Sequence, residues 1–266
     1  MLVEVINEGI ANTKENISDE IIKIMLENIG SIDPILRDET IYVGFWKLFN
    51  QKRISIVQKH YILHYVLDKD LLNYRIGSKD DDSVFTRSFT ALLVCIILED
   101  HYKEAWIEEN TEKQLIKYVM KYLQNEKDPR GYVENKGWAH AFAHGSDLLA
   151  TISKSQYFNE DDSLAGLNII KNILESAYPL FYGEEGRLSK AVVIMIENNK
   201  IDFDSLNNII NQITEDHIIN RKKNAFFRRF IMTFIFSLKY SGLGEEYSKQ
   251  VSSRYLEFSY KSFRCL

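Results

Sequence analysis

The stretch KGWAHAFAHGSDLL, residues 136–149, sets histidine and aspartate at helical spacing among alanines and aromatic residues. At about 100° per residue, His140, His144 and Asp147 fall within an arc of roughly 60° on one face of a helix. Trp138 falls almost opposite, and alanines occupy the flanks, where they let neighbouring helices approach closely. We therefore predict a central, buried helix with one aromatic face and one ionisable face.

The rest of the chain shows the same helical periodicity. Apolar residues recur at spacings of three and four, strand-like alternation is hard to find, and the 266 residues include only three prolines. Helices are expected to begin after Ser18, which can cap free backbone N–H groups, and at Asp33-Pro34. Further helices are expected near residues 53–72, 83–98, 112–124, 162–178, 185–198, 204–218, 221–240 and 244–258.

This pattern predicts an all-α protein with a single domain over residues 1–266. Helices on short polar joints pack as antiparallel hairpins, and we expect these to stack as an irregular α-solenoid of the HEAT or armadillo type. The chain shows no crisp repeat period, so an irregular helical domain and a closed α/α ring of hairpins are the alternatives. The acidic turn at residues 77–82 (GSKDDD) is the best candidate for a loop.

Composition indicates an ordinary soluble protein, with 45% hydrophobic residues, 27% charged residues and a net charge of −5. Binding to nucleic acid would need a basic face and is not expected. The apolar runs are too short to cross a membrane, and the first ten residues lack the basic region of a signal peptide. Because only two cysteines occur, we expect no disulfide framework and a cytoplasmic location.

The paired histidines suggest three kinds of chemistry. Histidines four residues apart on a helix can chelate a divalent metal, with an aspartate one turn further as third ligand or orienter. However, three ligands on one helix converge poorly, and no glutamate follows His140 as it would in a zinc protease. For His140, His144 and Asp147 the sequence leaves open a structural hydrogen-bond network, a site without metal, and a metal site. No other cofactor is expected.

The turn DPRGYV, residues 128–133, places further ionisable groups just before this helix. Arg130 suits bidentate contacts with carboxylate or phosphate, and Tyr132 offers a hydroxyl. If the turn folds back over the helix start, these groups meet near Lys136 and His140. The alternative is that Arg130 caps the C-terminus of a helix.

The longer stretch DPRGYVENKGWAHAFAHGSDLL resembles the signature of a bacterial family of uncharacterised helical proteins, an Arg-Gly-Tyr turn followed by Lys-Gly-Trp-Ala-His-Ala and His-Gly-Ala-Asp. The sequence departs from that pattern at Pro129 and Ser146, where an aliphatic residue and alanine are usual; neither change removes an ionisable group. Other similar stretches are LRDE at 36–39, SVFTRSF at 83–89, YGEEGRL at 182–188 and NAFFRR at 224–229.

This resemblance implies an all-helical protein without an established substrate, cofactor or catalytic residue. The matching positions are Arg37, Asp38, Glu39, Arg87, Ser88, Arg130, Tyr132, Lys136, Trp138, His140, His144, Asp147, Glu185, Arg187, Asn224 and Arg228.

Arg87 is set between two phenylalanines in an apolar run, and a buried arginine is costly unless it is paired with a carboxylate. The expected partners are Asp38, Glu39, Asp147 and Glu185. Such pairs would either fix helix register or converge with the histidines on one cleft.

We expect a binding or scaffold protein with a polar cleft around His140, His144 and Asp147. The partner would be a protein, a peptide or a small anionic ligand. The candidate ligand-binding residues are Arg130, Tyr132, Lys136, Arg87 and Trp138.

The alternative is a hydrolase-type enzyme, possibly metal-dependent, in which His140 or His144 acts as general base and Asp147 orients it. An enzyme needs a histidine that solvent can reach and a pocket beside it, whereas a scaffold tolerates buried histidines. The chain has no nucleophile-elbow motif and no phosphate-binding glycine loop, which favours the binding interpretation.

Overall fold

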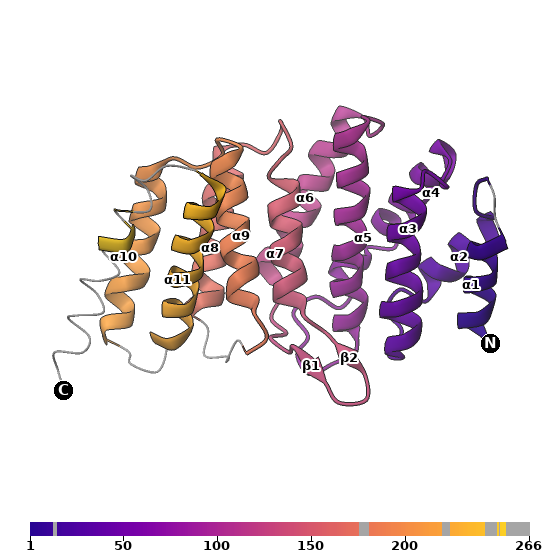
Figure 1. The fold of residues 1–266 in the computed structure, drawn as a ribbon, viewed down its shortest axis with the longest axis horizontal. Coiled ribbons are helices and arrows are strands. Elements are labelled where there is room, and N and C mark those ends of the chain that lie inside the picture. The colour runs from indigo at the N-terminus through magenta and orange to yellow at the C-terminus, as the bar shows by residue number, and fades with distance from the viewer. Residues whose placement is uncertain (13–14, 176–180, 220–223, 243–248, 250, 254–266) are drawn as a thin grey trace. The chain divides into compact units, whose positions relative to one another are not determined.

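The computed structural model describes residues 1–12, 15–175, 181–219, 224–242, 249 and 251–253. Contacts divide the chain into two compact units, Met1–Ile152 and Ser153–Leu266. The described residues are mainly helical and contain one short two-stranded sheet (Figure 1). This confirms the all-α class, while the solenoid, the closed ring and the single domain stay predictions.

The first unit is built from seven α-helices, one π-helix, one 3-10 helix and the two strands, counted over its described residues. Their bounds are α1 Leu2–Asn12, α2 Asp19–Glu27, η1 Ile35–Tyr42 (π), α3 Val43–Asn50, α4 Ile56–Asp68, η2 Leu71–Asn73 (3-10), α5 Ser83–Lys103, α6 Glu109–Asn125, β1 Tyr132–Val133, β2 Gly137–Trp138 and α7 Ala141–Ile152.

Helix α5 forms the centre of the first unit. It has 21 residues and buries side chains all around its circumference, as expected of a helix that is apolar on every side. It packs most extensively against α7, and it also contacts α3, α4, η1 and η2. The apolar run at residues 91–98 is therefore core, and Arg87 and Ser88 lie within that core with no exposed surface.

The second unit contains α8 Glu160–Glu175, α9 Glu184–Glu197, α10 Phe203–Ile219 and α11 Asn224–Ser241. Helix α9 packs mainly against α11, and α8 packs against α10. These four helices match the predicted ones closely. The last predicted helix, at residues 244–258, lies largely outside the described residues. Among the described helices, none combines the length and apolar character needed to span a membrane.

Two predicted helices in the first unit have a different form. The segment predicted at residues 53–72 is an α-helix only from Ile56 to Asp68; Asp70 then takes a φ of 49°, and η2 follows. The helix expected at Asp33-Pro34 begins as the π-helix η1 and becomes α-helical only at Val43. The capping role of Ser18 is confirmed, since its hydroxyl accepts the backbone N–H of Ile21 at 3.4 Å.

The motif segment departs most from the prediction, because residues 136–140 are not helical. Gly137 and Trp138 form β2, which pairs antiparallel with β1, and α7 begins only at Ala141. Asn135 and Gly137 have φ angles of 61° and 74°, a left-handed conformation that these two residue types adopt at low cost. A tight turn here prevents the helix from extending backwards, which the spacing of apolar residues could not reveal.

Candidate functional site

The hairpin β1–β2 presents two different faces because successive strand residues point to opposite sides. Tyr132 pairs with Trp138, and Val133 pairs with Gly137. The inner face carries Val133, which packs against a buried cluster that includes Phe85. The outer face carries Tyr132 and Trp138, whose rings meet edge to face at 5.1 Å and stay 52% and 38% exposed. We call these two side chains the outer face of the hairpin.

Arg37, on η1, holds the hairpin from inside. It is fully buried and donates to the carbonyls of Ser31 at 2.6 Å, Lys136 at 2.7 Å and Trp138 at 3.4 Å. Its guanidinium lies 4.2 Å and 4.6 Å from the ring centroids of two phenylalanines on α5, a cation–π arrangement. A Cβ at Gly137 would come within 3.2 Å of this guanidinium and 2.8 Å of Pro34. A side chain at that position would therefore force Pro34 to shift and would strain the positive φ of residue 137.

Asp38 supplies the counter-charge to Arg37, with 2.7 Å between its carboxylate and the guanidinium Nε. Burial lowers the pKa of Arg37, although Asp38 opposes that shift. Burial likewise raises the pKa of Asp38 to about 6, although Arg37 opposes that shift. Both charges of the pair are therefore poorly solvated. Holding the hairpin with a buried ion carries this desolvation penalty, which apolar contacts would not.

Arg87 also donates its hydrogen bonds to groups inside the protein. It makes a bidentate contact with Glu126 at 2.6 Å and 3.0 Å and donates to Ser83 Oγ at 2.8 Å. Its remaining donors reach carbonyls of the loop 74–78. The prediction that a buried arginine needs a carboxylate partner is correct in kind, but the partner is Glu126 and not Asp38, Glu39, Asp147 or Glu185.

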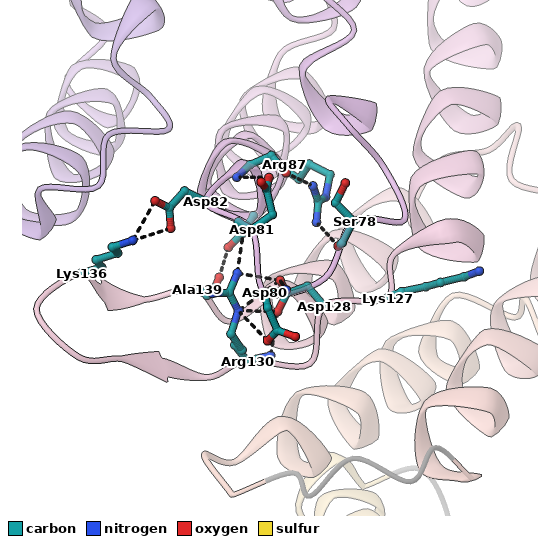
Figure 2. Close-up of polar contacts among 12 residues, drawn as sticks. Ser78, Asp80, Asp81, Asp82, Arg87, Lys127, Asp128, Arg130, Lys136 and Ala139 are labelled. Atoms are coloured by element: carbon teal, nitrogen blue, oxygen red, sulfur yellow. Dashed lines mark hydrogen bonds and ion pairs between the residues drawn. The ribbon is translucent and has the colours of Figure 1, made fainter.

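Two further cations join the hairpin segment to the acidic loop before α5, Arg130 through a hydrogen bond and Lys136 through an ion pair (Figure 2). Arg130 contacts the fully buried Asp128 at 2.7 Å and also donates to the carbonyl of Asp81 at 2.7 Å. The hydrogen bonds to Asp128 raise the pKa of Arg130. Lys136 contacts both carboxylate oxygens of Asp82, at 2.7 Å and 2.8 Å. The two cations therefore anchor this segment, and Arg130 does not cap a helix.

His140 lies at the junction between hairpin and helix. Its N–H donates to the carbonyl of Arg130 at 3.0 Å, which continues the hairpin pairing, and its carbonyl accepts the N–H of His144 at 2.9 Å, which opens α7. Its φ of 49° is left-handed and costs about 1–3 kcal/mol for a residue with a side chain. The ring stacks on Trp138 with 4.3 Å between centroids. The prediction that His140 lies within the helix is therefore wrong.

His144 lies deeper and is tied to α5. The hydroxyl of Ser88 donates to the carbonyl of Ala139, and its oxygen lies 2.8 Å from Nδ1 of His144. A hydroxyl has a single hydrogen, and that of Ser88 is directed at the carbonyl and not at the imidazole. The pair therefore differs from a nucleophile and its base, in which the imidazole accepts the hydroxyl proton. Ser88 is also fully buried.

The aromatic side chains form a continuous series from the surface into the core. Tyr132 contacts Trp138, which stacks on His140; the two imidazoles meet at 5.6 Å and 89°, and His144 meets Phe89 at 5.4 Å. Exposure falls along this series, from 52% at Tyr132 to 7% at His144. The structure thus brings the two histidines together, although they belong to different local structures.

Asp147 lies on α7, is 9% exposed and is one turn beyond His144. Within the described residues, no three His, Cys, Asp or Glu side chains are grouped so that they could hold a metal ion. The geometry therefore offers no three-ligand set at His140, His144 and Asp147.

Sequence reasoning did not give Arg37, Glu126, Asp128 or Gly137 a role at this site. A signal was present for two of them, since Glu126 and Asp128 lie only four and two positions before Arg130 of the Arg-Gly-Tyr turn. Arg37 and Gly137 come into contact only through the fold, because 100 positions separate them in the sequence.

The comparison with known families agrees with the resemblance seen in the sequence. The family model described as "Protein of unknown function (DUF2785)" matches residues 72–238, more than half of the chain, so the chain belongs to this family. The match covers α5, the hairpin and α7, but it does not reach Arg37. No curated protein and no solved structure matches the chain.

Proposed function

We propose that this member of the DUF2785 family is a binding protein, and that the outer face of its hairpin docks a protein or peptide partner. The observation that carries the proposal is the contrast within the hairpin. Its backbone is held by the fully buried Arg37, while Tyr132 and Trp138 keep 52% and 38% of their surfaces exposed. Tyrosine and tryptophan contribute most of the binding energy in many protein interfaces.

Rigidity supports this proposal. Binding costs less when the contacting side chains are already ordered, and Trp138 is fixed on one side by Tyr132 and on the other by His140. His140 has a left-handed backbone conformation, and its ring stacks on the indole. Backbone strain at functional sites often has such a positioning role.

The cationic side chains of the site already contact carboxylates, which favours a polypeptide partner over a small anion. Arg87, Arg130 and Lys136 are candidate anion ligands, and each already contacts a carboxylate at 3.0 Å or less. An added anion would have to displace a carboxylate that is held by several hydrogen bonds. Exposed aromatic rings need no such exchange when they pack against the apolar parts of a peptide.

A hydrolase fits these contacts less well. His144 is 7% exposed and its Nδ1 contacts the Ser88 hydroxyl, which is itself directed at a carbonyl. In the second unit, a depression of about 510 Å³ is lined by residues of the segments 158–164 and 199–205, and none of the candidate site residues contributes to it.

Selection of peptides from a random display library tests the proposal, with purified protein as the bait. Peptides that bind the parent are then measured by isothermal titration against Tyr132→Ala and Trp138→Ala. We expect Trp138→Ala to weaken binding by about 2 kcal/mol or more, roughly 30-fold, as at interface hot spots. Trp46→Ala is the matched control, because Trp46 is a 51% exposed tryptophan on α3.

The control variant should bind selected peptides within about twofold of the parent, since a peripheral contact contributes little energy. Thermal melts of the three variants separate a binding defect from a folding defect. Equal affinity of the parent and Trp138→Ala for every selected peptide would refute the hairpin as the docking surface.

A further inference from the structure

A second pair of histidines lies on α4, away from the hairpin. His60 and His64 are one helical turn apart, and their rings face each other with 6.4 Å between centroids and 23° between planes. Ile62 and Val66 on the same helix point into the core, whereas His60 is half-buried and His64 is exposed. Among the described residues, no hydrogen bond or ion pair engages either imidazole.

The side chains next to His60 are held in place by polar contacts. The edge of Trp106 meets the ring of His60 at 5.2 Å and 84°. The indole N–H donates to Asp100 at 2.8 Å, and Lys59 contacts the same carboxylate oxygen at 2.5 Å. The charge of Lys59, the residue next to His60, is therefore balanced locally. This arrangement limits the rotation of His60 and lowers the repulsion that an incoming cation would meet.

We propose that His60 and His64 form a two-imidazole site for a divalent transition-metal ion, with Zn²⁺, Ni²⁺ and Cu²⁺ as the ions that imidazole suits. Side chains four positions apart lie on the same face of a helix, which is the spacing that lets paired histidines bind one ion. Imidazole favours these ions over Mg²⁺ and Ca²⁺, which prefer oxygen ligands.

The site provides two protein ligands, and water or a partner's side chain completes the coordination. Within the described residues, no group of three His, Cys, Asp or Glu side chains is placed to hold an ion, which agrees with an open, two-ligand site. The residues involved lie on α4 and not on the hairpin. This proposal can therefore fail while the docking surface stands, and the reverse also holds.

Isothermal titration of the full-length, untagged protein with ZnCl₂ and NiCl₂ tests the proposal. We expect binding of one ion per chain, and a loss of about 100-fold in affinity when His60→Ala or His64→Ala removes one of two linked ligands. The exchange H64Y/Y65H is the matched control: it keeps the number of histidines but places them five positions apart, on different faces of the helix. It should bind as weakly as the single variants.

A spectrum distinguishes this site from other histidines in the chain. The electron paramagnetic resonance of the Cu²⁺-loaded parent should show two nitrogen ligands, and that of H64Y/Y65H should not. Replacing His140 by alanine should leave both the affinity and the spectrum unchanged. Thermal melts of the metal-free proteins check that each variant folds. Absence of stoichiometric binding to the parent, or equal binding by the double variant H60A/H64A, would overturn the proposal.

Discussion

The ion pair between Arg87 and Glu126 should be the polar contact on which the first unit depends most. Arg87 has no exposed surface and the side chain of Glu126 is 3% exposed, so neither charge can turn to solvent if the other is removed. Replacing Arg87 by methionine keeps most of the volume and removes the charge. Glu126 would then keep two backbone N–H donors, those of Lys127 and Asp128, and would lose its counter-ion.

Breaking a buried pair by removing one partner costs about 3–5 kcal/mol. For chains of this size each kcal/mol lowers the melting temperature by about 2–4 °C, so Arg87→Met should lower it by about 6–20 °C. Glu126→Gln should cost about 2–3 kcal/mol, because the amide oxygen still accepts the backbone N–H groups while the amide NH2 cannot accept the hydrogen bond from Arg87 Nε.

Urea unfolding of the parent, both single variants and the double variant provides the measurement. The double variant Arg87→Met with Glu126→Gln should lose less than the sum of the single losses, by about 1–3 kcal/mol, because the two residues share one contact. Exposed Lys52→Met, whose contact with Glu104 is a surface pair, should change stability by less than about 0.5 kcal/mol. Additive losses, or an Arg87→Met variant within about 1 kcal/mol of the parent, would refute this reasoning.

Three further predictions concern the neighbouring contacts. Gly137→Ala should lower the free energy of unfolding by about 1–3 kcal/mol, since the new Cβ meets Pro34 and alanine disfavours positive φ. An unchanged midpoint of urea unfolding would show that the expected clash does not occur. The raised pKa of Asp38, about 6, means that the folded state holds this proton more tightly than the unfolded chain does. The contribution of Asp38 to stability should therefore fall by about 1–2 kcal/mol as the pH rises from about 4 to 6, and Asp38→Asn should remove this contribution from the profile measured by chemical unfolding. Ser88→Ala and His144→Ala should each cost about 1–3 kcal/mol and should be strongly non-additive in a double-mutant cycle, because they share one hydrogen bond.

Much of the helical framework could be read from local patterns. The capping serine at residue 18, the apolar run at residues 91–98 and the acidic loop at residues 77–82 all have the expected structure, because each depends on neighbours within one or two turns. Helix boundaries were less accurate where the backbone takes a left-handed conformation, as at Asp70 and Asn135. Periodicity measures which face is apolar and carries no information about a single φ angle.

The candidate site could be predicted only in part. The histidines and the Arg-Gly-Tyr turn were recognisable from residue type, and the need of Arg87 for a carboxylate followed from the cost of burying a charge. Its partner could not be predicted, because several carboxylates satisfy that need equally well until the chain is folded. The role of Arg37 in holding a hairpin about 100 positions away likewise depends on distance in space, not on spacing in the sequence.

By itself, then, the amino-acid order determined a helical body and the residue types gathered around one turn, because those properties follow from local spacing and from the energy of burying each side chain. The tertiary structure alone decided which charged groups form ion pairs with one another, which hydroxyl contacts His144, and which rings face solvent. These depend on contacts between segments far apart in the chain, where a shift of a few ångströms exchanges one partner for another.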